Sequence, residues 1–297
     1  MSKRPQGERA GEFVQRWRSS FRHPDQKTQI LKDYNCGFRT ASEWYRLLKN
    51  STPTLPHKKQ AVINDLHAPF HDKQAVKVCF AVIKAIQPQE IDIAGDLLDF
   101  YQLSKFDKNP IQIGTIQEHI NIGRDLLVEL RDANPDADIY FHVGNHCDRL
   151  RRYLWSIAKE LAGLDCLDLK ELLDLAKLKI KLVDYEEGRV VNGIFSVSHG
   201  SIASIHSAFT AKRTFEKQGG NGIVGHSHRG GSFYKTDKFG THGYWENFCL
   251  CELEPDYIKH PNWQHGFTIV NYIGDRFFVE QIPIVKGKCV YGGKLYE

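Results

Sequence analysis

The sequence has no long hydrophobic run, no apolar leader and no cysteine framework. No apolar stretch approaches the roughly 20 residues that span a bilayer, and the first residues are polar and basic, unlike a signal peptide. The seven cysteines are odd in number and lack the paired spacing of zinc fingers. Internal repeats and low-complexity segments are also missing. We therefore expect a cytoplasmic protein with reduced thiols, most of them buried.

The composition that is present fits a folded globular chain with an uneven charge. With 297 residues, 41% of them hydrophobic and 26% charged, the chain can form one large domain or one domain with an appendage. The first sixty residues hold thirteen Lys and Arg against five Asp and Glu, a net +8, whereas the remainder is net −4. A basic head suggests an anionic partner, and a solvated basic tail is the alternative.

The basic head contains apolar residues at helical spacing. Periodic stretches around Phe13 and Ile30 predict two helices, and Thr40 with Glu43 forms a capping box that predicts the start of a third. A Gly-containing turn at residues 35–37 makes this a helix-turn-helix pattern. Its last helix would present four residues to DNA: Arg39, Ser42, Arg46 and Lys49. A docking or oligomerisation cap is the alternative.

The two prolines of residues 51–56 indicate a linker, so we expect a module at 1–58 and a second domain at 59–297.

In the second domain, strand and helix patterns alternate. Asp72 and a Thr115–Glu118 capping box predict helix starts, and apolar periodicity predicts further helices at 150–161, 169–176 and 202–209. Gly274-Asp275 predicts a hairpin. The fold class is therefore α/β with mixed sheets covered by helices.

Five short apolar runs in this domain each end in polar residues that can bind metal. The endings are Asp65-Leu66-His67, Gly95-Asp96-Leu97-Leu98-Asp99, Gly144-Asn145-His146, Ser198-His199-Gly200 and Gly225-His226-Ser227-His228. In open α/β sheets the ligand crevice lies beyond the carboxyl ends of the strands, so these endings can converge on one site.

The residue types at these endings indicate a metal centre. Asp, His and Asn supply the oxygen and nitrogen donors that suit Mn, Fe, Zn or Ni better than a thiolate site does. Residues i and i+2 of an extended segment point the same way, so Asp65 and His67, and likewise His226 and His228, can reach one site together. Asp96 could bridge two ions about 3.5–4 Å apart.

The five motifs, in this order, resemble the calcineurin-like metallophosphoesterases. That family carries D-x-H, GD-x-x-D, GNH, a lone His often before Gly, and GH-x-H, and the resemblance covers residues 60 to about 285. Phe100 replaces the arginine found after the GD-x-x-D motif in the Ser/Thr-phosphatase branch, which argues against that branch. Small phage and bacterial members look most similar.

The resemblance implies a four-layer fold of two packed mixed β-sheets flanked by helices. It also implies two divalent ions, with Mn²⁺ favoured and Fe, Zn or Ni as alternatives. The ligand set would be Asp65, His67, Asp96 and His228 for one ion, and Asp96, Asn145, His199 and His226 for the other. His146 would be the general acid, with Asp99 orienting it.

The implied reaction is hydrolysis of a phosphate ester by a metal-activated hydroxide, with His146 protonating the leaving oxygen. A phosphodiesterase or nuclease is favoured, with residues 1–58 recruiting DNA. The alternatives are a phosphomonoesterase and a DNA-binding protein whose hydrolase-like body is only a scaffold. Arg149 and Arg229 could clamp phosphate oxygens, and surface pairing is the alternative.

Overall fold

The computed structural model describes residues 5, 8–21, 25–48, 57–107, 109, 114–185, 187–255 and 258–297. The chain divides into two compact units, one made of the N-terminal helices and one that begins at Lys59. The expected linker at 51–56 and Lys49 lie outside the described residues. Among the residues that are described, every helix is too short or too polar to cross a membrane.

The N-terminal unit consists of three helices, α1 (Glu8–Ser19), α2 (Asp25–Asp33) and α3 (Phe38–Leu48). They enclose a small aromatic core made by Phe13, Trp17, Ile30, Ala41 and Trp44. The expected start of α3 at a Thr40 capping box is wrong. The helix begins at Phe38, three residues before the Ala41 start that a Thr40 cap implies, because the Gly37 carbonyl already accepts a hydrogen bond from the Ala41 amide at 3.0 Å.

The larger unit contains a six-stranded sheet in the order β11-β10-β1-β2-β3-β4. Four neighbouring strands of this sheet are parallel, namely β1 (His57–Ile63), β2 (Glu90–Ile93), β3 (Asp138–His142) and β4 (Ile180–Val183). At one edge lie β10 (Gly266–Ile273) and β11 (Arg276–Pro283), joined at Gly274-Asp275 as the sequence predicts. Parallel strands bring their carboxyl ends to one edge of the sheet.

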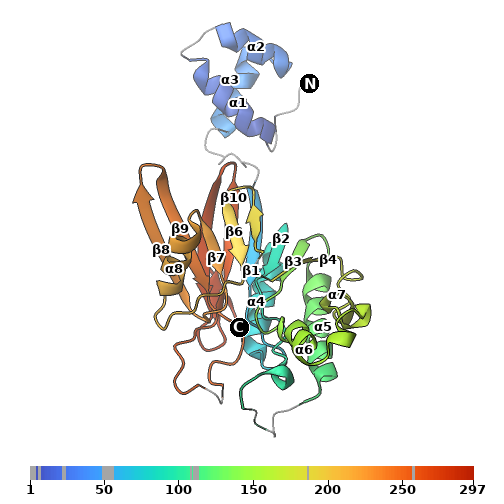
Figure 1. The fold of residues 1–297 in the computed structure, drawn as a ribbon. Helices are drawn as coiled ribbons and strands as arrows, with labels where there is room; N and C mark the ends of the chain where they lie inside the picture. Colours follow the sequence, from blue (N-terminus) through green and yellow to red (C-terminus); the bar gives the residue numbers. More distant parts are fainter. Residues whose placement is uncertain are drawn as a thin grey trace. The chain divides into compact units, whose positions relative to one another are not determined.

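A second, five-stranded sheet has the order β5-β6-β7-β9-β8, and four of its strands, β6, β7, β9 and β8, are labelled in Figure 1. Its strands are β5 (Arg189–Val191), β6 (Phe195–Ser198), β7 (Gly222–Val224), β8 (Gly230–Asp237) and β9 (Gly240–Asn247). β6, β7 and β9 are parallel, whereas β5 and β8 pair antiparallel. A small separate sheet joins β12 (Cys289–Tyr291) and β13 (Lys294–Tyr296). The expected α/β class with mixed sheets is confirmed.

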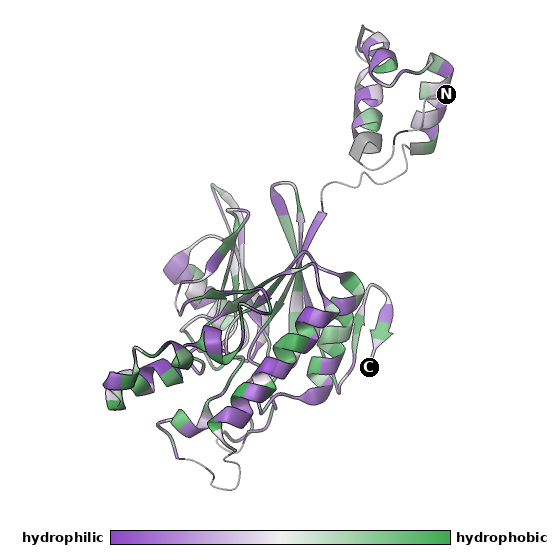
Figure 2. Ribbon diagram, turned by 90° about the vertical axis from the view of Figure 1, so that its right-hand side faces the viewer, coloured by the Kyte–Doolittle hydropathy of each residue, from purple (hydrophilic) through white to green (hydrophobic). Residues whose placement is uncertain are grey.

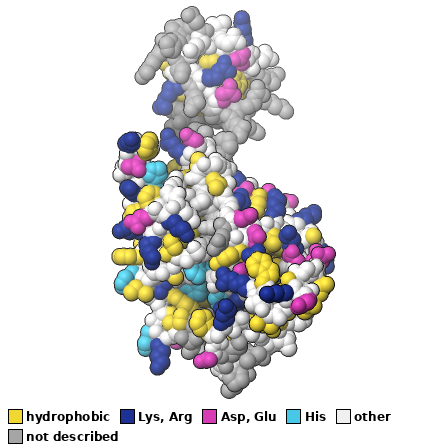
Figure 3. All heavy atoms as spheres, in the orientation of Figure 1, with side chains coloured by type: hydrophobic (Ala, Val, Ile, Leu, Met, Phe, Trp, Pro, Cys, Tyr) yellow, Lys and Arg dark blue, Asp and Glu magenta, His cyan; other side chains and the backbone are white. Residues whose placement is uncertain are grey.

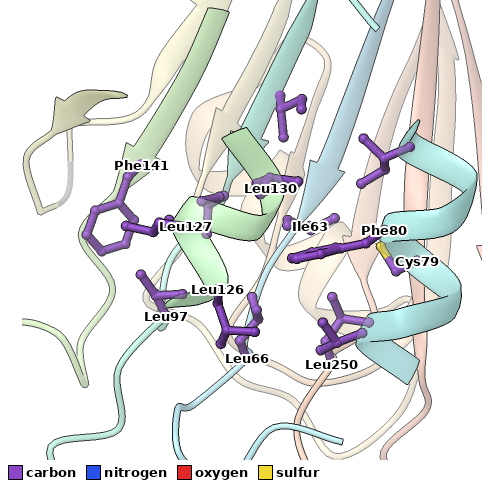
Figure 4. Close-up of a cluster of buried hydrophobic side chains, with 14 of the residues drawn as sticks. Ile63, Leu66, Cys79, Phe80, Leu97, Leu126, Leu127, Leu130, Phe141 and Leu250 are labelled. Atoms are coloured by element: carbon purple, nitrogen blue, oxygen red, sulfur yellow. The ribbon is translucent and has the colours of Figure 1, made fainter. Parts of the chain in front are cut away.

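Helices cover the six-stranded sheet through a continuous apolar core. α4 (Lys73–Ile86) starts at the predicted Asp72 cap, and α5 (Ile116–Ala133) starts at the predicted Thr115–Glu118 capping box. Leu127 and Leu130 of α5 and Phe80 of α4 share this core with Ile63 and Phe141 of the sheet (Figure 4). Figure 2 shows both hydrophobic and hydrophilic residues on the flanking helices, as expected for elements with one buried face.

The other helical expectations are only partly correct. Residues after the GNH motif form α6 (Arg149–Ile157) and then short 3₁₀ turns at Lys159–Leu161 and Asp165–Leu167, while α7 spans only Leu169–Leu172. No helix covers 202–208; α8 is Phe209–Gln218 and packs on β8 and β9. There the Ser204 amide donates to the Thr210 hydroxyl at 2.9 Å, so a side chain takes the place of a helical carbonyl.

A buried charged cluster lies between the two sheets. Asp92 of β2 accepts from His142 Nε2 at 2.8 Å and from the Arg189 guanidinium of β5 at 2.6 and 3.0 Å. Arg189 also pairs with Glu90 at 2.8 Å. His142, which lies inside a strand, therefore takes part in the contact between the sheets.

Replacing Leu127 by alanine tests the core. The side chain is 1% exposed, so the substitution should cost about 2–5 kcal/mol of unfolding free energy, measured by urea unfolding. The matched control is Val128→Ala on the same helix, where the side chain is 37% exposed and the change should stay within about 0.5 kcal/mol. Equal effects of the two substitutions would contradict the assigned packing of α5.

Candidate metal centre

The structure brings together the polar residues that follow β1, β2, β3, β6 and β7. Asp65, His67, Asp96, His199 and His228 are buried, and Asn145, His146 and His226 are partly buried. On the larger unit, histidine side chains gather beside a group of Lys and Arg side chains (Figure 3). These five strand endings therefore lie together in the structure, as we expected from the sequence.

The backbone at these residues differs from the expected extended form. φ is positive at 51° in Asp65, 51° in His67, 45° in Asp96, 67° in His226 and 58° in His228. The expectation that Asp65 and His67, and likewise His226 and His228, lie in extended segments is therefore wrong. Instead, a left-handed residue at each of these positions turns its side chain inward, at a cost of order 1–3 kcal/mol each. Such strain is typical of functional sites.

Glycines next to these residues allow the close approach of the loops. A Cβ on Gly95 would lie 2.1 Å from His199 Nδ1, and one on Gly144 would lie 2.1 Å from Asp96 Oδ1. A Cβ on Gly225 would lie 2.8 Å from the Asn64 amide nitrogen. These three glycines therefore make room for polar side chains from other strand endings.

One half of the site is built around Asp96. Its Oδ1 accepts from the His146 amide at 2.8 Å, and its Oδ2 lies 3.2 Å from His199 Nε2. Asn145 Oδ1 lies 2.9 Å from the same His199 nitrogen. His199 Nδ1 donates to the Ala94 carbonyl at 3.0 Å, which leaves Nε2 as the ring nitrogen that faces the site.

The other half is built around Asp65. Its Oδ2 accepts from the His226 amide at 2.8 Å and from the Asn64 side chain. Its Oδ1 is buried and has no hydrogen-bond partner in the described part of the chain. Nitrogens of His228, His67 and His199 lie 3.6, 3.7 and 3.9 Å from that oxygen. A buried carboxylate oxygen without a hydrogen-bond partner is uncommon in folded proteins, and a bound cation would account for it.

The donor set could hold metal. Three overlapping groups each have ligand atoms within 4.8 Å of one another, namely His67, His228 and Cys251; His67, Asp96 and His146; and Asp96, His199 and His226. Oxygen and imidazole donors dominate, as in sites for first-row divalent metals. The residues that could hold metal include all seven expected ligands, either in these groups or in hydrogen-bond contact with them.

Opposite charges dominate the electrostatics of the site in the absence of a metal. Burial disfavours ionised Asp65, but His228 and His67 hold its pKa well below the usual range, and His199 has a similar effect on Asp96. Burial lowers the pKa of His199, but the adjacent Asp96 raises it to about 9. The pKa of His228 also rises to about 9, through Cys251 and Asp65 against burial. These charges favour the uptake of a cation in exchange for protons.

Two histidines of the site are shifted the other way. Burial and the neighbouring His199 lower the pKa of His226 to about 4. Burial and the charge of His67 lower the pKa of His146. Both rings are therefore neutral near pH 7 and have a lone pair to offer.

His146 belongs to a hydrogen-bonded group with Asp99 and Arg149. Its Nδ1 lies 3.0 Å from Asp99 Oδ2, and His67 Nδ1 lies 3.0 Å from the same oxygen. Arg149 donates to Asp99 Oδ1 at 3.0 Å and, through its other nitrogen, to His146 Nε2 at 3.2 Å. Asp99 is thus placed to orient His146, and Arg149 covers the His146 nitrogen expected to face a leaving group.

Arg229 also lies next to the site. Its NH1 donates to the Ser227 carbonyl at 2.8 Å, and its Nε has no hydrogen-bond partner among the described residues.

The remaining expected contact residues, Arg39, Ser42 and Arg46, belong to α3 of the N-terminal unit. Phosphate binding by Arg149 and Arg229 stays a prediction.

Several supporting residues were not identified from the sequence. Asn64 holds Asp65 and the Phe248 carbonyl, and Glu246 of β9 accepts from the Ser227 hydroxyl at 2.9 Å, which fixes the middle of the GH-x-H loop. Cys251 Sγ lies 3.7 Å from His228 Nδ1, and Trp263 packs edge-on against the His228 ring. The polar Asn64 directly before Asp65 was a usable signal, whereas the other three come from distant segments.

Comparison with known proteins shows distant relatives. The chain is 28% identical to the Gene 54 protein of Mycobacterium phage D29 over 258 residues, which cover 81% of this chain and 99% of that protein. It is also 28% identical to the Gene 54 protein of Mycobacterium phage L5 over 264 residues, with the same coverage. No protein-family model matches the chain.

Solved structures with a similar arrangement include Vps29 from Chaetomium thermophilum, at a TM-score of 0.42 and 12% identity, covering 77% of this chain and 92% of that one. A dimetal phosphatase from Danio rerio has a TM-score of 0.40 and 12% identity, with 75% and 95% covered. YfcE, a phosphoesterase from E. coli, has a TM-score of 0.35 and 13% identity, with 76% and 100% covered.

Gly144→Ala should abolish tight metal binding. The new methyl group would lie 2.1 Å from Asp96 Oδ1 and 2.5 Å from the Asp96 amide, so the two strand endings must separate. Metal content after dialysis, measured by mass spectrometry, is the readout. In the control Gly163→Ala, the methyl group would meet no described atom within 4 Å. Equal metal content in both variants would contradict the tight approach of these loops.

Metal binding should release protons at pH 7.5. His199 and His228 have pKa values near 9 without metal, Asp65 and Asp99 raise the pKa of His67 against its burial, and all three rings must be neutral to bind metal, so about three protons leave per protein. Apparent affinity should rise as the pH increases above 7 and level off once all three rings are neutral without metal. Titration calorimetry in buffers of different ionisation enthalpy measures the release. Heats that do not depend on the buffer would contradict this assignment.

Proposed function

We propose that the larger unit is a metal-dependent hydrolase of phosphate esters. The observation that carries the proposal is the buried Asp65 Oδ1, which has no hydrogen-bond partner in the described chain although three imidazole nitrogens lie within 3.9 Å of it. Such an arrangement is costly without a cation and favourable with one. A pure DNA-binding scaffold would have no reason to maintain it.

In this proposal the seven expected ligands hold two divalent ions. Asp65, His67 and His228 would bind one, Asn145, His199 and His226 would bind the other, and Asp96 would contact both. When bound, the ions would lower the pKa of a coordinated water and offset negative charge on phosphoryl oxygens. We favour Mn²⁺ because the donors are carboxylate, amide and imidazole, while Cys251 lies on the Nδ1 side of His228.

His146 is the proposed general acid. Asp99 Oδ2 accepts from His146 Nδ1, which sets the orientation of the ring. Arg149 donates to Nε2 of the neutral ring, so Nε2 carries no proton in this state, and Arg149 must leave before that nitrogen can take one up. We infer that a substrate phosphate draws the Arg149 NH2 group away, while its NH1 stays bonded to the Asp99 carbonyl at 2.9 Å. Nε2 would then take a proton from solvent, and the ring would pass that proton to the leaving oxygen.

A diester substrate is favoured over a monoester. Near pH 7 a phosphomonoester carries up to two negative charges, whereas a diester carries one. Arg149 stays paired with Asp99 through NH1 when its NH2 group turns to a phosphate, and Arg229 donates to the Ser227 carbonyl, so besides the metals only part of one guanidinium would face the phosphate and little cationic charge would remain for the second charge of a monoester. This supports a phosphodiesterase of the nuclease class.

Hydrolysis of bis(p-nitrophenyl) phosphate with added Mn²⁺ tests the proposal. Asp96→Asn should lower the rate by at least about 100-fold, because Asp96 contacts both proposed ions, and circular dichroism should be unchanged. His206→Ala, which removes an exposed histidine outside the ligand groups, is the control and should keep the full rate. The monoester p-nitrophenyl phosphate should be the poorer substrate.

Each alternative has its own outcome in this assay. Preferential hydrolysis of the monoester would retain the metal centre but overturn the diester preference. Metal binding without turnover of either ester would contradict the hydrolase proposal. Activity retained in Asp96→Asn would show that the reaction takes place elsewhere.

A further inference from the structure

The N-terminal unit carries a second chemical surface, independent of the metal centre. α2 and α3 are joined by the four residues Tyr34–Gly37, and α1 packs against both helices. Phe13 of α1 lies against Trp44 of α3 with ring centroids 5.9 Å apart, and Ile30 of α2 is buried in the same core. A short turn between two helices that a third helix supports is the arrangement of helix-turn-helix DNA-binding units.

The two faces of α3 have opposite character. Ala41 and Trp44 are buried at 0% and 7% exposure, whereas Arg39 and Arg46 are exposed. Arg39 and Arg46 are seven residues apart, so they lie two turns apart on one side of the helix, with Ser42 between them. α3 therefore packs through one side and presents two guanidinium groups on another.

The charges of these two arginines are available to a partner. Arg16 on α1 is neutralised within the unit, because it pairs with Asp33 and with Glu12. Within the described residues, neither Arg39 nor Arg46 takes part in an ion pair, and Glu43 on the same helix is exposed. The face of α3 thus keeps positive charge in the part of the chain that is net +8 over sixty residues.

The dimensions of this face match duplex DNA. At 1.5 Å per residue the seven-residue separation of Arg39 and Arg46 spans about 10 Å, which is about three base pairs at 3.4 Å each. The major groove, about 12 Å wide, admits one helix. Arginine donates in pairs to guanine edges and to phosphates, and Glu43 could accept from a cytosine amino group.

We propose that the N-terminal unit binds duplex DNA with α3 in the major groove, using Arg39, Ser42 and Arg46. The fourth expected contact, Lys49, lies outside the described residues and is not needed for the proposal. The proposal does not depend on the hydrolase function, because it rests on a different unit and on different residues. An oligomerisation or protein-docking surface is the competing interpretation.

Fluorescence anisotropy with a labelled 20-base-pair duplex and the full-length protein tests this inference. Arg39→Ala and Arg46→Ala should each weaken binding about tenfold and reduce the salt slope by about one. The control Arg18→Ala removes an exposed arginine from α1, outside the α2–α3 pair, and should change affinity less than twofold. Arg39→Lys keeps the charge but loses paired donation, so it should restore the salt slope and only part of the affinity.

Three results would overturn the proposal. The first is no binding of the unmodified protein to duplex DNA at 50 mM salt. The second is equal affinity for the Arg39→Ala, Arg46→Ala and Arg18→Ala variants, which would place binding elsewhere. The third is tighter binding to single-stranded RNA of the same length. Because Arg39 and Arg46 are exposed, unchanged melting temperatures of the variants should exclude unfolding as the cause of any loss.

Discussion

The larger unit depends on two carboxylates, Asp65 and Asp96, that are buried at strand ends among imidazoles. Each carboxylate uses one oxygen to accept from a backbone amide of another loop, at 2.8 Å in both cases, and turns the other oxygen toward histidine nitrogens. Buried charges are tolerated only when they are paired and hydrogen-bonded. The same contacts that hold the loops together therefore also form the candidate cation site and keep five left-handed residues in place.

The sequence predicted the α/β class with mixed sheets because apolar runs define strands, and it predicted that the motifs meet because polar residues directly after parallel strands lie at one edge of a sheet. The motifs in fact follow β1, β2 and β3 of one sheet and β6 and β7 of the other, so their convergence also depends on how the two sheets pack, which the sequence does not show. It could not predict the left-handed backbone at Asp65 or His228, since that conformation is imposed by partners more than a hundred residues away. Glu246 and Cys251 escaped notice because their partners, Ser227 and His228, lie 19 and 23 residues earlier in the chain and no local pattern connects them. The start of α8 was misplaced because Thr210 satisfies the Ser204 amide across a segment with helical periodicity.

The group of His146, Asp99 and Arg149 links binding to chemistry. Asp99 accepts from Arg149 and lies 3.0 Å from the Nδ1 atoms of both His146 and His67, so one carboxylate connects the proposed acid, a proposed ligand and the Arg149 guanidinium. This arrangement brings the Arg149 guanidinium beside His146, although the residue that follows Asp99 in the sequence is Phe100. The basic face of α3 offers an anionic partner a separate point of contact, on another unit of the chain.

The central claim is that the strand endings hold a pair of cations. A crystal soaked in Mn²⁺ and measured above the manganese absorption edge tests it most directly. We expect two anomalous peaks about 3.5–4 Å apart, both in contact with Asp96, one also beside Asp65 and the other beside Asn145. A single peak, peaks away from Asp96, or no peak would contradict it.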